Sequence, residues 1–143
     1  MYSFIKTSHS HFAWLVLIAL VVVVGSATLA FTSKRSWNAS QFKLALVGLI
    51  LSHIQLLMGL ILYFTSPYGM SNLSGETMKD SFSRLLAVEH PFTNILAIVL
   101  ITIGYSKAKK TIGTSSTPKT IAIFYGIGLL LILSRIPWQT WLG

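Results

Sequence analysis

The chain contains no cysteine, and only three of its 143 residues are acidic. Without cysteine it cannot form a disulfide, a thiolate metal site, an iron–sulfur cluster or the covalent haem attachment of a CxxCH motif. Three carboxylates are too few for a carboxylate-rich metal site, and the sequence contains no Gly-rich phosphate-binding loop. Any cofactor would therefore be held by histidine, methionine or oxygen ligands.

Charge of either sign is also scarce. Charged residues make up 10% of the chain, whereas 53% of the residues are hydrophobic and the mean hydropathy is +0.71. This composition is typical of an integral membrane protein. The net charge of +8 comes from basic residues in short connections between apolar runs, which indicates membrane orientation rather than a nucleic-acid partner. We expect an all-α protein with one domain, residues 1–143, and the lipid bilayer as its main partner.

Four apolar runs are long enough to cross a bilayer, which requires about 20 residues. They predict membrane-spanning helices at residues 12–31, 44–65, 85–105 and 121–136, the last of them short. The first run is expected to be a retained span because its apolar part is too long for a typical signal peptide. The predicted fold is an integral membrane four-helix bundle.

The basic residues predict how this bundle is oriented. The first and third connections are purely basic, with Lys34, Arg35, Lys43, Lys107, Lys109, Lys110 and Lys119. The second connection instead balances Lys79 and Arg84 against Glu76 and Asp80. By the positive-inside rule, the first and third connections are cytoplasmic. Both termini and the second connection are then periplasmic, and the protein is a multi-pass protein of the bacterial inner membrane.

Histidines are the most informative residues, because an imidazole within an apolar span needs a partner. His9 and His11 stand at the start of the first span, His53 within the second and His90 near the start of the third. At 1.5 Å per residue, His53 lies about 18 Å in from the end of its span and His90 about 9 Å. Two ligands of one metal ion should lie at similar depth, which favours His9 or His11 over His53 as the partner of His90. Span tilt leaves the pair of His53 and His90 open.

Three charged residues are expected near His90. Arg84 and Arg135 lie at the level of His90, where their guanidinium groups could bind the carboxylates of a haem or reach lipid headgroups. Glu89 could pair with either arginine or accept a hydrogen bond from a histidine N–H. The alternative for His90 is a purely structural hydrogen bond with Glu89 or Asn94, and for His9 and the neighbouring histidine a solvated position at the interface.

Two features of the helices bear on the same region. Pro91 has no N–H, so the carbonyl of Ala87 lacks its helical donor, which predicts a kink beside the histidine that precedes the proline. Gly48 and Gly59 share one face of the second span. Their lack of a side chain permits close approach of a neighbouring helix or a flat cofactor.

Four segments carry a resemblance to known proteins: HSHFAWLVLIAL (9–20), LSHIQLLMGLILYFTSP (51–67), LLAVEHPFTNILAIVLITIGYSKAKK (85–110) and TIAIFYGIGLLLILSRIPW (120–138). Together they resemble a family of small four-helix membrane proteins of Bacteroidetes that is described as cytochrome b-like. The resemblance implies a haem b cofactor. It matches the family's histidine motifs to His9, to His53 with Gln55, and to Glu89 with His90.

The additional His11 departs from the family pattern, so the resemblance does not choose the N-terminal ligand. A histidine near the start of one span, Gln55 and Gly59 in the next, and a histidine opening the third are also similar to half of a haem A synthase. This second resemblance implies ligation by His9 or His11 together with His90. The second half of such an enzyme is missing, so its reaction is not implied.

These observations together predict a b-type cytochrome that carries one haem b and passes single electrons, linked to a respiratory or quinone chain, rather than an independent enzyme. His90 is expected to be one ligand, with His9 and His53 competing for the other side. One alternative is a cofactor-free structural or assembly subunit of a larger complex. Another is a carrier that holds a metal ion or haem at His9, His11 and His90, and three histidines could also bind zinc or copper. Whether the chain forms a homo-oligomer is left open.

Overall fold

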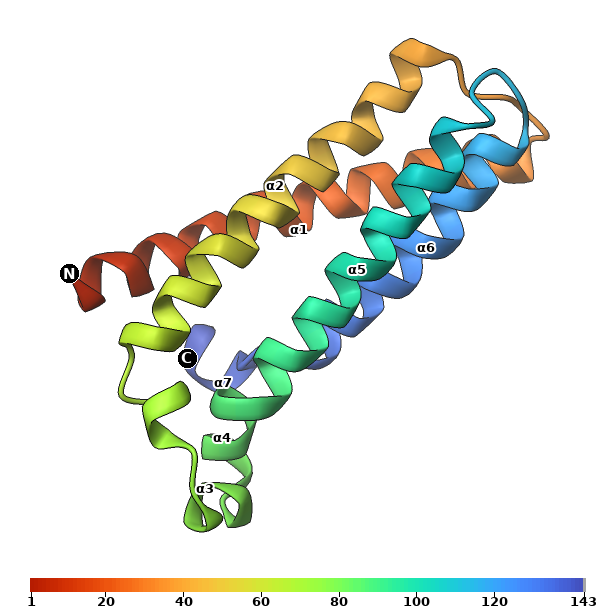
Figure 1. The fold of residues 1–143 in the computed structure, drawn as a ribbon. Helices are drawn as coiled ribbons and strands as arrows, with labels where there is room; N and C mark the ends of the chain where they lie inside the picture. Colours follow the sequence, from red (N-terminus) through yellow and green to blue (C-terminus); the bar gives the residue numbers. More distant parts are fainter. Residues whose placement is uncertain (143) are drawn as a thin grey trace.

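The structure, a computed structural model, describes residues 1–142, and this range is built from helices. Figure 1 shows long helices arranged side by side: α1 (Tyr2–Thr32), α2 (Ala39–Thr65), α5 (His90–Lys109) and α6 (Ser116–Ser134). α5 continues a shorter helical segment, so that the third long helix runs over Ser81–Lys109. All four are long and apolar enough to cross a membrane, which confirms the predicted number of long apolar helices.

The helices extend beyond the predicted spans at most ends. α1 begins at Tyr2, so the two N-terminal histidines lie on a helix rather than ahead of one. α2 begins before the apolar run because Asn38 and Gln41 form a reciprocal cap. The Asn38 side chain accepts a hydrogen bond from the Gln41 N–H, and the Gln41 side chain accepts one from the Asn38 N–H, both at 2.9 Å. α6 ends at Ser134, short of the predicted boundary at residue 136.

Short helical segments form the second connection. A 3₁₀ turn (Met70–Asn72) is followed by α3 (Gly75–Lys79), α4 (Ser81–Arg84) and a π-helical turn (Leu85–Glu89) that leads into α5. The Asp80 carboxylate caps α4 by accepting the Ser83 N–H at 2.8 Å, and its hydrogen bonds with Ser83 lower the pKa of Asp80. A last short helix, α7 (Trp138–Trp141), follows α6.

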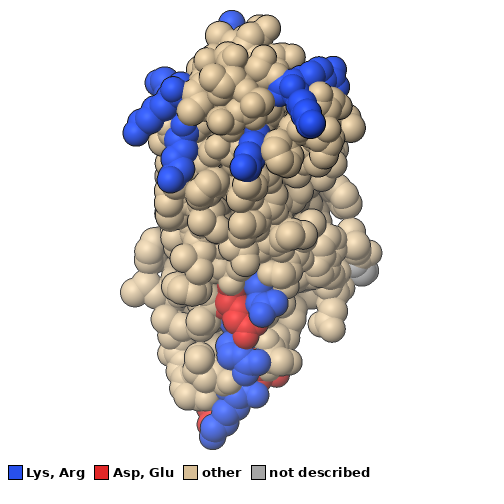
Figure 2. Space-filling model, turned by 90° about the vertical axis from the view of Figure 1, so that its right-hand side faces the viewer, with Lys and Arg blue, Asp and Glu red and all other residues tan. Residues whose placement is uncertain are grey.

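The four long helices pack in the order α1, α2, α5, α6, since α1 contacts α2 and α6 while α5 contacts α6 and α2. Both termini lie at the same end of the molecule as the second connection, and the first and third connections lie at the opposite end (Figure 1). Figure 2 shows only basic side chains at one end, while basic and acidic side chains lie together near the other. This arrangement agrees with the up-and-down topology expected from the loop charges.

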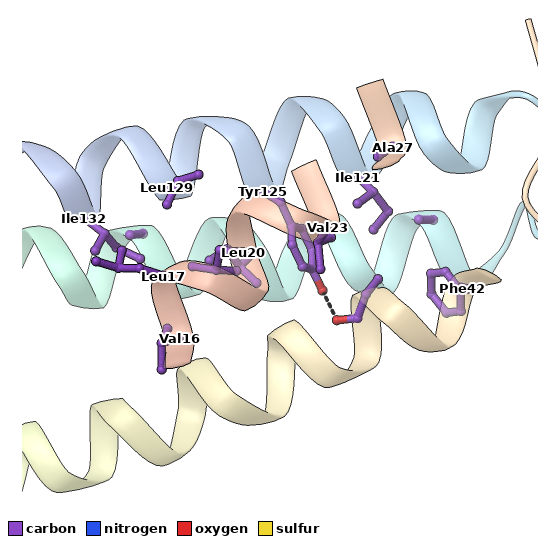
Figure 3. Packing of buried hydrophobic residues seen from close by; sticks show 14 of the residues in the cluster. Val16, Leu17, Leu20, Val23, Ala27, Phe42, Ile121, Tyr125, Leu129 and Ile132 are labelled. Atoms are coloured by element: carbon purple, nitrogen blue, oxygen red, sulfur yellow. Dashed lines mark hydrogen bonds between the residues drawn. The ribbon is translucent and has the colours of Figure 1, made fainter. Parts of the chain in front are cut away.

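Tyr125 of α6 packs in the centre of the bundle and is fully buried. Its hydroxyl donates a hydrogen bond of 2.7 Å to the carbonyl of Ala45 on α2, as drawn in Figure 3. Gly48 makes this approach possible, because a Cβ at position 48 would lie 3.3 Å from Val23 and 3.4 Å from Tyr125. The predicted close approach of a neighbouring helix at Gly48 is confirmed.

Lys34, two residues after the last residue of α1, has a left-handed backbone conformation with φ of 57°. The Arg35 N–H donates to the Ala30 carbonyl at 2.8 Å and the Lys34 N–H to the Phe31 carbonyl at 3.1 Å. These two bonds form a Schellman motif, in which glycine usually occupies the left-handed position because it has no Cβ to strain.

Replacing Lys34 with glycine is therefore expected to raise the free energy of unfolding by about 1 kcal/mol, because the strain of a side chain at positive φ is removed. Thermal unfolding in detergent measures the change. Ser33→Gly is the control, since Ser33 has φ of −89° and gains no relief from glycine. Equal effects of the two substitutions would show that Lys34 is not strained.

Candidate cofactor-binding site

His9 on α1 and His90 at the start of α5 lie close together at the end of the bundle that holds the termini. Their ring centroids are 6.2 Å apart and their planes form an angle of 84°. Two imidazoles that bind opposite sides of one metal ion, through nitrogen atoms about 2.0–2.1 Å from it, have ring centroids about 6 Å apart. The pair therefore has the separation expected of two ligands of one metal ion.

His90 is oriented through one ring nitrogen. Nδ1 lies 2.8 Å from the carbonyl oxygen of Arg135, to which an Nδ1–H can donate. Asn94 donates from its side-chain amide to the carbonyl of His90 at 2.6 Å. With the proton on Nδ1, Nε2 is left as a lone-pair donor, which is the usual arrangement of a metal-bound histidine.

His9 has a different environment, because its Nδ1 is buried and has no hydrogen-bond partner among residues 1–142. The ring packs against Gly59 of α2, where a Cβ would lie 3.2 Å from His9 Cε1. The Gln55 side-chain amide donates to the His9 carbonyl at 3.0 Å, while Gln55 Oε1 is likewise buried and unpaired within the described residues. Unpaired buried polar atoms are rare and often mark a functional site.

The helix that carries His90 is irregular just before the histidine. Pro91 supplies no N–H to the carbonyl of Ala87, and the π-helical turn Leu85–Glu89 occupies this stretch. The Tyr63 hydroxyl of α2 donates to the Ala87 carbonyl at 3.0 Å and replaces the missing backbone donor. The irregularity predicted from Pro91 thus takes the form of a π-helical turn that is tied to α2.

Replacing Tyr63 with phenylalanine is expected to lower the free energy of unfolding by about 1–2 kcal/mol, because the buried carbonyl of Ala87 loses the one side-chain donor that it has within residues 1–142. Thermal unfolding in detergent measures this loss. Tyr105→Phe is the matched control, since Tyr105 stacks on Phe42 and its hydroxyl makes no hydrogen bond within residues 1–142. A loss of similar size in both variants would contradict the role given to the Tyr63 hydroxyl.

Glu89 joins the two arginines expected near the site. Its carboxylate lies 2.8 Å from Arg84 Nε and 3.7 Å from Arg135 Nε. Of the alternatives raised by the sequence, the structure therefore contains the pairing of Glu89 with the arginines. Each guanidinium has further N–H donors, one of which Arg84 uses on the carbonyl of Met78 at 2.9 Å.

A cavity of about 410 Å³ adjoins the histidine pair. Apolar side chains from all four long helices make up most of its wall, and its polar lining includes His9, Gln55, Tyr63, His90 and Asn94. An apolar cavity with a few convergent polar groups is the usual form of a small-molecule or cofactor site. The two histidines and the apolar walls are the residue types that a flat, largely apolar cofactor requires.

The other two histidines lie elsewhere. His53 is exposed on the bundle surface, where its Nδ1 lies 2.8 Å from the Leu49 carbonyl and its Nε2 lies 3.5 Å from the Thr102 hydroxyl. His11 is exposed on α1, and neither residue lines the cavity. The structure thus brings together His9 and His90, the pair that similar depth favours, and leaves out His53 and His11.

Three-histidine sites are not formed in this structure. Within residues 1–142 there is no group of three or more His, Cys, Asp or Glu side chains that could hold a metal ion. The structure therefore does not bring three histidines together at one point among these residues, and His9 and His90 are the two that lie close together beside the cavity.

Comparison of the chain with models of protein families, with curated proteins and with solved structures finds no match. The fold defines a helical chain whose four long helices could cross a membrane. Its functional interpretation therefore depends on the geometry of the site.

Proposed function

We propose that the chain is a membrane-bound b-type cytochrome that holds one haem b between His9 and His90. The observation that carries this proposal is the pair of imidazoles 6.2 Å apart beside an apolar cavity. When bound, the haem supplies a one-electron redox couple. Two histidine ligands leave no coordination position for a substrate, which favours electron transfer over an independent enzymatic reaction.

The protein orients the two ligands by different means. His90 is held by its Nδ1–H bond to the Arg135 carbonyl, which fixes the ring and raises the basicity of Nε2. For His9, the Gln55 side-chain amide donates to the backbone carbonyl at 3.0 Å and joins α1 to α2, while the ring Nδ1 has no partner within the described residues. The apolar wall excludes water and lowers the local dielectric, which also affects the redox potential.

Arg84 and Arg135 are the candidates for binding the two propionates. Both side chains are partly exposed, at 36% and 47%, and Glu89 pairs with both of them. None of the three residues lines the cavity itself, so they would meet the propionates outside it. The two arginines and one glutamate carry a net charge of +1, which balances one of the two propionates. Guanidinium groups suit carboxylates because two parallel N–H donors match two oxygen atoms.

The proposed location is the bacterial inner membrane, with the histidine pair near the periplasmic side. The supporting observation is that the connections at the other end of the molecule are purely basic, as cytoplasmic connections commonly are. At that depth the site could exchange electrons with a respiratory or quinone-linked partner.

The test is an optical spectrum of the full chain, purified in detergent from cells supplied with haem, first oxidised in air and then reduced with dithionite. The proposal expects sharp reduced α and Soret bands of a low-spin haem b and about one haem per chain. A protein that stays colourless after haem supplementation would contradict the proposal and support a cofactor-free structural subunit. Haem that passes readily to an apoprotein would instead indicate a carrier.

A further inference from the structure

A second cavity, of about 360 Å³, lies at the opposite end of the molecule from the histidine pair. It is formed where α1 ends and α2 begins, and its lining includes Leu29, Ala30, Arg35, Ser40 and Leu44. The cavity shares no lining residue with the one beside the histidines. It is therefore a separate candidate for ligand binding.

The lining of this cavity combines two kinds of chemistry. Arg35 and hydroxyl side chains such as Ser40 provide hydrogen-bond donors on one part, while Leu29, Ala30 and Leu44 provide apolar surface on another. Arg35 makes no ion pair within residues 1–142, and its N–H bond to the Ala30 carbonyl fixes its backbone beside the cavity. A ligand that satisfies both parts is an amphiphile with an anionic head.

Trp37 supports the same interpretation. The residue is only 3% exposed and lines the cavity, and its indole N–H takes part in no hydrogen bond within the described part of the chain. The Trp37 carbonyl accepts a hydrogen bond of 2.7 Å from the Gly113 N–H, which joins the first and third connections. A buried indole that still has a free donor is suited to the interface between lipid chains and headgroups.

The positive charge at this end of the molecule favours an anionic ligand. Seven of the eleven Lys and Arg residues lie in or beside the first and third connections, and all three acidic residues lie outside them. Figure 2 shows several basic side chains, and no acidic ones, on the visible face of this end. An anionic phosphate group is therefore attracted here over a wide area, and a guanidinium binds phosphate with two parallel hydrogen bonds.

We propose that this cavity binds one anionic phospholipid from the surrounding leaflet. Its phosphate would lie on Arg35, and one acyl chain would run along Leu29, Ala30 and Leu44. A lipid in this position would bridge α1 and α2 at the level where both helices leave the membrane. The proposal involves no residue of the histidine site, so a colourless protein would leave it unaffected.

The test uses native mass spectrometry of the full chain in dodecyl maltoside with phosphatidylglycerol or phosphatidylcholine at equal concentration. We expect one retained phosphatidylglycerol and a preference over phosphatidylcholine of about tenfold, as charge-assisted hydrogen bonds provide. Arg35→Gln should lose most of this preference. Lys109→Gln removes the same charge at the same end but outside the cavity, and should keep it.

Equal retention of the two lipids, or equal losses in Arg35→Gln and Lys109→Gln, would overturn the proposal. Inorganic phosphate is added as a separate competitor, and complete displacement of the lipid at equal concentration would identify a soluble-anion site instead. If Arg35→Gln does not fold, Arg35→Lys is used, because it keeps the charge but loses the paired donors. It is expected to retain only part of the preference, and full retention would contradict the role of Arg35.

Discussion

Alanine in place of either His9 or His90 is expected to abolish low-spin haem binding, whereas alanine in place of His11 or His53 is expected to leave it intact. The first two rings lie 6.2 Å apart beside the cavity, and the other two are exposed outside it. Loss of one of two ligands should weaken haem binding by about 100-fold or more, since loss of an outer-shell partner alone costs 10–100-fold.

The measurement is the dithionite-reduced spectrum together with the haem content of each purified variant. Each of the four variants loses one imidazole. His11→Ala and His53→Ala therefore control for nonspecific effects of removing a histidine. His53→Ala also tests the alternative ligand predicted from the sequence, because the His53 Nδ1–H can donate to the Leu49 carbonyl at 2.8 Å and so has a partner without a metal. Loss of haem in His53→Ala with retention in His9→Ala would overturn the proposed ligand pair.

Alanine in place of Gly104 is expected to lower the free energy of unfolding by about 2 kcal/mol, through overpacking of α5 against α6. A Cβ at position 104 would lie 2.3 Å from the Cβ of Phe124, an atom that cannot move without its backbone. The two helices must therefore separate. Because α6 leads to Arg135, whose carbonyl holds His90 at 2.8 Å, the separation should also disturb the histidine site.

Thermal unfolding in detergent measures this effect, with Gly25→Ala as the matched control. A Cβ at Gly25 would meet no atom within 4 Å, so alanine there should be neutral or stabilising by up to about 1 kcal/mol through its higher helix propensity. Equal unfolding temperatures of the two variants would show that α5 and α6 do not pack as closely as described.

The long helices could be predicted from the sequence, because an apolar run of about 20 residues nearly always forms a membrane-spanning helix. The residues at which these helices begin and end could not. α2 starts ahead of its apolar run because the reciprocal cap of Asn38 and Gln41 satisfies the first backbone groups. α1 likewise continues through polar residues to Tyr2. Hydropathy measures where lipid can surround a helix, whereas capping and packing decide where the helix stops.

The choice between His9 and His11 is a second point that the sequence alone could not predict. His9 lies on the same helical stripe as the buried residues Val16, Leu20 and Val23, which follow it at intervals of seven, eleven and fourteen. His11 is about 200° away around the helix and faces outward. The sequence does not reveal this stripe because α1 is apolar on every side, so depth could be predicted but the inward face could not.

The supporting contacts of the site join residues far apart in the chain. Pro91 indicated that the Ala87 carbonyl needs a donor, but nothing local identified Tyr63 as that donor. The contact of Gln55 with His9 had one available signal, since Gln55 and Gly59 are four residues apart and so share a helix face. Such partners depend on how the helices are rotated against one another.

Electron paramagnetic resonance of the oxidised, haem-loaded chain tests the central claim most directly, because the spectrum depends on both ligands and on the angle between them. Two imidazoles whose planes meet at 84° should give a low-spin signal of high anisotropy. A high-spin signal, the rhombic low-spin signal of nearly parallel imidazoles, or no haem signal at all would contradict the assignment of His9 and His90 as the two ligands of one haem.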